Sequence, residues 1–450
     1  MTGKFTMKIL IYTPQITSRI RYITDYIFHD YLLFDCQLTD SEEEFCSSQS
    51  VKMSYANQSL GDELVVGQHS LLLENNVNQP NIEMLEYNGL PAFFAVNVAA
   101  SLFPFDLFAA SFFLITRYEE YLPHTSDKFG RYSPKNALAV KENFLEKPLV
   151  NIWATGLLAE LRKRYPSVDF PKREFDYLPT YDIDLPYAYL HRNFFVNMGG
   201  LLNSLVKNHF REAKSRFLTM IHYRKDKYDT YGFQFALQQQ FGFRPCYFVL
   251  CALHRGRYER SLSTDNRHIQ RLIHRLQKHG KVGIHPSFVS HSDATKIGQE
   301  IKKLSPLIQG KIEISRQHYL MLSMPLTYKS LIENGINEDY TMGYASRPGF
   351  RASVCTPFKW FDLSSNEVTP LTVYPFAYMD GTLNHYMQLS RMDAELLIQR
   401  LIRNVKGVDG LFISLWHNSS LCDSGSWHGW RSIYKHSIEY ADSLCEIKEG

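Results

Sequence analysis

From residue 174 to the C-terminus, short apolar runs alternate with longer amphipathic segments. Runs of strand length occupy residues 175–181, 245–251, 281–285, 311–315 and 410–416. Apolar residues recur at the period of a helix in residues 265–279, 293–307, 326–334 and 392–405. A chain that alternates strands and helices in this way folds as a parallel sheet or barrel covered by helices. The pattern therefore predicts an α/β fold.

The N-terminal third of the chain has a looser pattern. Residues 7–28 predict a short strand followed by a helix, and residues 149–165 have helical spacing. The Pro-containing stretch 165–172 is typical of a linker. We therefore expect an N-terminal domain of unknown role over residues 1–170 and a second domain over residues 171–450.

The longest apolar tract, residues 90–116, is interrupted by polar and helix-breaking residues. It contains Pro91, Asn97, Pro104 and Asp106, each of which is costly or disruptive in a bilayer. The tract therefore predicts buried core, with no integral membrane span. The first residues also lack the uninterrupted apolar stretch and cleavage site of a signal peptide, which favours a cytoplasmic location.

Composition and missing motifs exclude several classes of function. Lys and Arg number 49 against 46 Asp and Glu, a net charge of +3, so nucleic acid is not expected as a partner. Seven cysteines without a CxxC pair do not favour a zinc ribbon or a disulfide framework. The chain also lacks GxxxxGK[ST], GxGxxG, HExxH and GxSxG, the usual signatures of phosphate-loop, dinucleotide, zincin and α/β-hydrolase chemistry.

Polar residues with catalytic potential follow the predicted strands. Asp182 and Asp184 are two positions apart, which places both side chains on the same side of a strand. His285 can ligate a divalent metal, Arg316 can orient a carboxylate, and His417 is suited to acid catalysis. Each motif alone is weak, because such residues are more often ordinary structural ones. Together they lie where α/β barrels place their chemistry.

In this order the motifs resemble those of the polysaccharide deacetylase family, also called the NodB-homology or carbohydrate esterase family 4 domain. Residues 180–184 (TYDID) resemble the family's Asp-rich first motif, and His285 begins its HxxxH motif. Residues 316–319 (RQHY) resemble RxPY with His318 in place of Pro. Asp339 is the best match to an Asp-led fourth motif, and His417 matches an LxxH-like fifth.

The resemblance covers roughly residues 175–445. It is closest to a divergent bacterial branch with GFRA and WHN…GW blocks, found here at residues 349–352 and 416–430. That branch carries an uncharacterised N-terminal domain, which residues 1–170 resemble. The family fold is a distorted (β/α)₇ barrel, so we expect such a C-terminal barrel with a smaller α/β N-terminal domain.

The resemblance implies a hydrolase that removes an acetyl group from an amino sugar with the help of a divalent metal, expected to be zinc. Asp184 and His285 would hold the metal. The second His of HxxxH is replaced by Val289, and a catalytic zinc site usually has three protein ligands. His318 is the expected third ligand and His291 the alternative. If neither serves, the chain would be a non-catalytic carbohydrate-binding or scaffold protein on a degenerate barrel.

The resemblance also implies roles for four further residues. Asp182 would take a proton from the attacking water, and Arg316 would hold and tune that carboxylate. His417 would protonate the leaving group, and Asp339 would orient His417. A more distant alternative is the hydrolysis of another amide or ester on the same fold.

Residues 189–229 interrupt the strand–helix alternation and predict a basic helical insert. The charge is either an ordinary solvated helix face or a clamp for a phosphate-bearing substrate or an anionic surface. In the cytoplasm a small saccharide, such as a nucleotide- or lipid-linked sugar, is the expected substrate. Five aromatic residues flank the motifs and could stack on sugar rings: Tyr181, Phe288, Tyr319, Tyr344 and Trp416. The sugar, the bond and the oligomeric state stay open.

Overall fold

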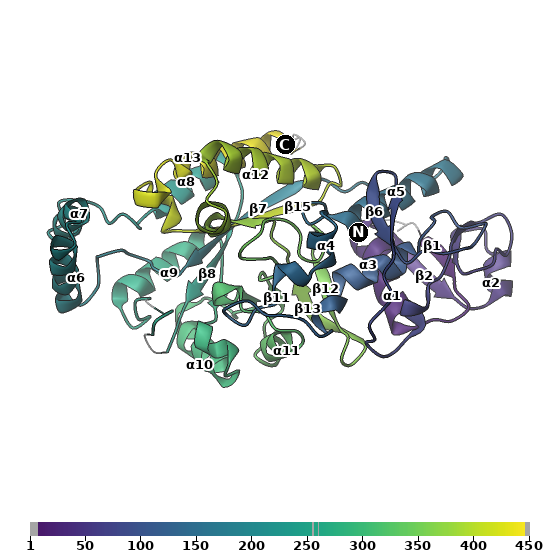
Figure 1. Cartoon of the computed structure of the whole chain (residues 1–450), viewed down its shortest axis with the longest axis horizontal. Coiled ribbons are helices and arrows are strands. Elements are labelled where there is room, and N and C mark those ends of the chain that lie inside the picture. Colours follow the sequence, from purple (N-terminus) through teal and green to yellow (C-terminus); the bar gives the residue numbers. More distant parts are fainter. Residues whose placement is uncertain (1–7, 254–255, 260, 446–450) are drawn as a thin grey trace.

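The computed structural model describes residues 8–253, 256–259 and 261–445. Its strands form a four-stranded sheet, a nine-stranded sheet and a two-stranded hairpin. Figure 1 shows an elongated molecule with the N-terminal residues, in purple and blue, at one end and the larger sheet in the middle. The chain is mixed α/β, as the sequence predicted.

The N-terminal region is built on the four-stranded sheet, in which every pairing is parallel and the order is β2-β1-β3-β4. Its strands are β1 (Lys8–Tyr12), β2 (Asp35–Thr39), β3 (Val51–Tyr55) and β4 (Leu64–Val66). Strands β5 (Met84–Tyr87) and β6 (Leu90–Phe93) form the hairpin. The helices are α1 (Ser18–Thr24), α2 (Glu42–Ser47), α3 (Leu107–Ile115), α4 (Leu138–Lys141) and α5 (Leu149–Arg164).

The apolar tract forms core, as expected from its interruptions. All nine residues of α3 are buried. Asp106 caps this helix by accepting a hydrogen bond of 2.9 Å from the backbone N–H of Ala109. Among the described residues, no helix combines the length and the apolar character needed to cross a membrane.

The larger sheet has the order β12-β13-β11-β10-β9-β8-β7-β15-β14. Its pairings are parallel except that between β12 and β13. The strands are β7 (Asp176–Ile183), β8 (Cys246–Leu250), β9 (Lys281–His285), β10 (Ile314–Ser315), β11 (Glu338–Asp339), β12 (Phe358–Asp362), β13 (Glu367–Val373), β14 (Tyr378–Met379) and β15 (Leu411–His417). Because the order ends at β12 and β14, it does not confirm a closed seven-stranded barrel.

Helices connect the parallel strands in the alternation that the sequence predicted. They are α8 (Tyr231–Phe241), α9 (Arg267–His279), α10 (Thr295–Leu304), α11 (Leu326–Glu333) and α12 (Arg391–Lys406), and α13 (Trp430–Ser443) follows the last strand. The predicted helix at 392–405 corresponds to α12, which begins after Ser390, whose hydroxyl accepts from the backbone N–H of Asp393. Two more helices, α6 (Phe194–Val206) and α7 (Phe210–Met220), occupy the predicted insert.

A buried ion-pair cluster joins the N-terminal region to the larger sheet region. Glu120 accepts from Arg117 at 2.8 Å and from Arg351 at 2.6 Å, and all three side chains are buried. Arg117 lies just after α3, whereas Arg351 belongs to the GFRA block. One continuous apolar core also runs through both regions, so the two regions pack as neighbours with a shared interior.

Candidate metal centre

Strands β7, β9, β10 and β15 of the larger sheet place polar residues at one edge of the sheet, and β8 lies among them. Strands β10, β9, β8, β7 and β15 are consecutive and parallel, so their carboxyl ends lie side by side. In β7, Tyr181 and Ile183 pack into the core. Asp182 alternates with them and therefore points to the opposite face. Asp184 follows directly after the strand, and the β7–β15 register sets His417 opposite Asp182.

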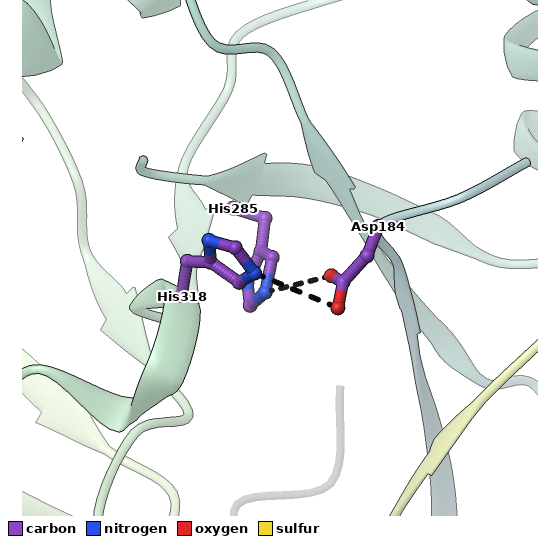
Figure 2. A group of neighbouring side chains, drawn as sticks. All are labelled: Asp184, His285 and His318. Carbon is purple, nitrogen blue, oxygen red and sulfur yellow. Dashed lines mark ion pairs between the residues drawn. The ribbon is translucent and has the colours of Figure 1, made fainter. Parts of the chain in front are cut away.

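Asp184, His285 and His318 form a compact cluster. The ligand atoms that the three offer all lie within 4.8 Å of one another. Asp184 Oδ1 is 3.2 Å from His285 Nε2, and Asp184 Oδ2 is 3.6 Å from His318 Nε2. Figure 2 shows both imidazoles turned toward the same carboxylate. A carboxylate and two imidazoles are a ligand set that zinc and related divalent metals use.

The hydrogen bonding of His285 shows that this cluster fits a cation. His285 Nδ1 lies 2.6 Å from the backbone carbonyl oxygen of Arg316, which can only accept, so Nδ1 carries the proton. In the neutral imidazole, Nε2 then presents a lone pair to the Asp184 carboxylate. Two facing lone pairs require a proton or a metal ion between them. Among the described residues no hydrogen bond reaches the buried Asp184 Oδ1.

Electrostatics at the cluster favour a charged carboxylate. Burial alone would raise the pKa of Asp184, but His318, His285 and His417 outweigh it and hold this pKa well below its usual range. For His285, burial lowers the pKa, but the charges of Asp182 and Asp184 leave it raised. Asp184 is therefore ionised, the form in which a carboxylate can serve as a metal ligand.

Asp182 lies beside the cluster and is held by Arg316. Arg316 Nη1 donates to Asp182 Oδ1 at 3.0 Å, and Arg316 Nε donates to the backbone carbonyl of Tyr340 at 2.9 Å. The guanidinium is completely buried and lies 4.5 Å above the ring centre of Phe248. Asp182 Oδ2 is 3.7 Å from His285 Nε2. The second carboxylate is therefore fixed in orientation beside the three possible metal ligands.

His417 is oriented by Asp380, and the expectation that Asp339 does this is wrong. His417 Nδ1 lies 2.8 Å from Asp380 Oδ1, and its backbone N–H donates to Asp380 Oδ2 at 2.7 Å. Asp339 accepts instead from the hydroxyls of Ser315 and Thr341, both at 2.8 Å, within the sheet. Asp380 follows β14, which pairs directly with β15. It is therefore the neighbour of His417 in space.

The pairing with Asp380 determines the protonation of His417. Burial lowers the pKa of this imidazole, but the charge and hydrogen bond of Asp380 and the charge of Asp184 outweigh burial and raise it to about 10. His417 Nε2 points back to the cluster, 3.6 Å from Asp184 Oδ2. At neutral pH the imidazole therefore carries a proton on the side that faces the site.

The alternative third ligand, His291, lies outside the cluster. Its Nε2 is 3.3 Å from Ser323 Oγ, and Val289, at the position of the missing motif His, is 39% exposed. His318 joins the cluster because residues 316–319, which follow β10, fold back toward the end of β9. The backbone N–H of His318 donates to the carbonyl of Pro286 at 3.1 Å, and this bond holds His318 beside His285.

Comparison with known proteins gives limited matches. Residues 9–166 match a family model described as a family of unknown function (DUF7033). No curated protein matches the sequence. A crystal structure of a protein provisionally described as a polysaccharide deacetylase from Mycobacterium smegmatis aligns with a TM-score of 0.39 and 12% identity. The alignment covers 63% of this chain and 88% of that chain.

A cavity of about 570 Å³ opens in front of the cluster. The residues around it include Asp182, Asp184, His285, His318 and His417. Its outer wall has residues that sequence reasoning missed or did not place: Arg131, Leu250, Tyr258, Leu320, His385 and Tyr386. Lys225 and Lys227 line a separate cavity beside α7.

Of the five expected aromatic residues, one lines this cavity and a second packs behind it. Tyr319 lines it, and Phe288 packs against Tyr319 with ring centres 5.6 Å apart. The other three are core instead. Tyr181 stacks on Tyr247, Tyr344 packs against Arg351, and Trp416 packs against Tyr434. Alternation along β7 and β15 accounts for Tyr181 and Trp416, since a residue beside a catalytic residue in a strand points to the opposite face.

Proposed function

We propose that this protein is a metal-dependent hydrolase that removes an acetyl group from an amino sugar. One observation carries the proposal: the Asp184–His285–His318 cluster, the Asp182–Arg316 pair and the His417–Asp380 pair face a single cavity. The order of the sequence motifs gives independent support. The sheet would then be a distorted and incompletely closed barrel.

In this proposal Asp184, His285 and His318 hold the metal, which would be zinc because one carboxylate and two imidazoles suit it. When bound, the metal would supply Lewis-acid polarisation of the acyl carbonyl and would acidify a water molecule. His285 keeps Nε2 free for a ligand role because its Nδ1–H donates to the Arg316 carbonyl.

Asp182 acts as the general base. Its Oδ1 is occupied by Arg316, which leaves Oδ2, the oxygen nearer to His285, to accept the proton of the attacking water. Arg316 is a positioning residue, because it is buried behind Asp182 and fixes the carboxylate without facing the cavity. As the water oxygen bonds to the acyl carbon, the proton goes to Asp182.

His417 acts as the general acid. Its Nδ1–H is held by Asp380, and its Nε2–H can be delivered to the sugar nitrogen as the C–N bond breaks. The nitrogen departs as a free amine and the acyl group as acetate, so that one water is consumed for each bond cleaved. A proton on His417 at neutral pH is what this step needs.

A saccharide substrate is supported by the walls of the cavity. Tyr258 and Tyr319 lie 5.4 Å apart at its edge, and aromatic faces of this kind stack on sugar rings. Arg257 adds positive charge, which suits the phosphate of a nucleotide- or lipid-linked sugar. Arg131, also at the cavity, is paired with Asp127 at 2.6 Å. We infer an acetylated sugar of this type, used in the cytoplasm.

The experiment that tests the proposal is acetate release from acetylated amino sugars and their nucleotide-linked forms. The full chain would be stripped with a chelator, assayed, and assayed again after zinc is restored. We expect acetate release that chelation abolishes and zinc restores. Saccharide binding that chelators leave unchanged, without acetate release at any metal loading, would replace the proposal with the non-catalytic alternative.

A further inference from the structure

Helices α6 and α7 form a hairpin with its large apolar side chains outside and its small or polar ones inside. An ordinary water-soluble helical hairpin has the reverse distribution. The buried residues of the α6–α7 hairpin are small or polar: Asn197, Ser204, Ala213 and Thr219. Its large apolar side chains point outward instead. Helices that pack through small residues and present apolar ones outward are typical of an apolar surrounding medium.

The outward apolar surface is extensive. Phe195 is 80% exposed and Val206 is 81% exposed. The other exposed members of this surface are Phe194, Val196, Leu202, Leu205, Phe210, Phe217, Ile221 and Tyr223. Figure 1 shows the two helices extending from the molecule at the end opposite the N-terminal sheet. An apolar surface of this size on a projecting element marks an interaction site.

Basic residues accompany the apolar surface. Residues 194–225 contain six Lys or Arg and a single acidic residue, Glu212. Five of the six are exposed: Lys207, Arg211, Lys214, Arg224 and Lys225. Arg216, the sixth, points inward and lies 4.6 Å above the ring of Tyr189. Arg211, Arg224 and Lys225 also line the cavity beside α7. The hairpin as a whole is thus both apolar and cationic, which is complementary to a surface that offers hydrocarbon and negative charge together.

The lengths of the helices limit how they can meet such a surface. At about 1.5 Å per residue, the 13 residues of α6 and the 11 residues of α7 are shorter than the ~30 Å hydrocarbon layer of a bilayer. Apolar helices that are too short to span, and that carry Lys and Arg, lie in the interface between headgroups and acyl chains.

We propose that the α6–α7 hairpin docks the protein on an anionic lipid membrane, with its Phe, Leu and Val side chains inserted at the headgroup boundary and its Lys and Arg side chains on the headgroups. The hairpin follows β7 after Asp184, at the same edge of the sheet as the metal cluster. Docking would therefore bring the cavity edge near the membrane. The proposal does not depend on the hydrolase function, since vesicle binding is measured without substrate or metal.

The test is flotation of the full chain with phosphatidylcholine vesicles, with and without phosphatidylglycerol. We expect binding to the phosphatidylglycerol vesicles, weaker binding to pure phosphatidylcholine, and loss of binding as salt is raised. No flotation with the anionic vesicles at low salt would overturn the proposal.

Two double variants distinguish specific docking by the hairpin from non-specific adsorption of exposed apolar residues. The variant Phe195→Ser with Val206→Ser removes two exposed hairpin side chains, and we expect at least a roughly tenfold loss of partitioning, since each was available for burial. The matched control, Leu326→Ser with Val368→Ser, removes exposed apolar residues elsewhere and should bind as the wild type does. Equal loss in both variants, or in neither, contradicts the assignment.

A second copy of the chain is the competing occupant of this surface. The molar mass of the wild type and of the hairpin variant, measured by light scattering after size exclusion, distinguishes the two. We expect the same mass for both. A wild-type dimer that the hairpin variant converts to a monomer would show that the hairpin is a self-association surface and would overturn membrane docking.

Discussion

At the scale of single residues, the order of motifs was informative where a residue ends a clear strand. Asp182, Asp184 and His285 follow or end apolar runs, and the structure brings them together. Asp380 was missed because β14 has only two residues, although the apolar stretch before it, 374–379, was a usable signal. Asp339 was given the role of Asp380 because a motif match carries no information on which strands are neighbours.

Asp182→Asn tests the base. We expect the rate of acetate release to fall by about 10²–10⁴-fold, because the amide cannot accept the proton. Metal content should not change, since the metal is assigned to other residues. The control is Asp176→Asn, an exposed aspartate on the same strand, which should keep wild-type activity. Full activity in Asp182→Asn would remove this residue from the mechanism.

The variant Asp380→Asn tests the role of His417 as general acid, through the pH profile of kcat. The rate falls when pH rises through the pKa of His417, because the acid then loses its proton. The charge of Asp380 helps to raise that pKa to about 10, so its removal should move the basic limb to lower pH. Asp339→Asn should leave the limb in place. A shift with Asp339→Asn alone would restore the sequence-based pairing.

At the scale of elements, long periodic helices such as α9 and α12 were predictable from the sequence. The part that the loop before α4 plays in the wall of the cavity was not. Residues 124–133 are polar and irregular, which predicts only a loop. In the structure Arg131 Nη1 donates to the backbone carbonyl of Tyr319 at 2.6 Å. Tyr319 has a positive φ of 57°, a backbone conformation that costs free energy for a residue other than glycine. Contacts between segments that are distant in sequence set this wall of the cavity.

Arg131→Ala tests whether the N-terminal region completes the site. Without the guanidinium, the Tyr319 carbonyl and the Asp127 carboxylate both lose their charged donor, and this wall of the cavity loses its support. We expect KM for the sugar substrate to rise several-fold while kcat changes little. Lys135→Ala, an exposed change nearby, serves as the control. An unchanged KM would indicate that Arg131 only supports the loop.

At the scale of the whole molecule, the sequence predicted two α/β regions but not what joins them. Residues 111–121 and the GFRA block at 349–352 are far apart in the chain, yet they supply the two sides of the Glu120 cluster. The short strands β11 and β14 escaped detection because two residues show no period. The order of strands does not confirm the expected distorted (β/α)₇ barrel. Closure depends on which strands pair in the assembled sheet, and that cannot be read from single strands.

Glu120→Gln tests this connection. Burial alone would raise the pKa of Glu120, but Arg351 and Arg117 lower it to about 2. Its stabilising effect is therefore present above the unfolded pKa of about 4.3 and is lost as pH falls toward 2. Removal of the charge should lower the free energy of unfolding by about 3–5 kcal/mol at neutral pH, because two buried guanidinium groups lose their partner.

Urea unfolding of the full chain measures this effect. Glu86→Gln, an exposed change in β5, is the control and should leave stability within about 0.5 kcal/mol of the wild type. We also expect the difference between wild type and Glu120→Gln to shrink at acid pH. A difference that stays constant from pH 7 to pH 3 would contradict the role of the ion pairs.

The central claim is that Asp184, His285 and His318 hold a divalent metal, and the most direct test is a calorimetric zinc titration of three proteins. We predict one zinc per wild-type chain. The His318→Gln variant should bind more weakly by at least about 100-fold, since even the loss of an outer partner of a metal ligand costs about 10–100-fold. His291→Gln should bind as the wild type does. Wild-type affinity in His318→Gln, or weakened binding only in His291→Gln, would contradict the account.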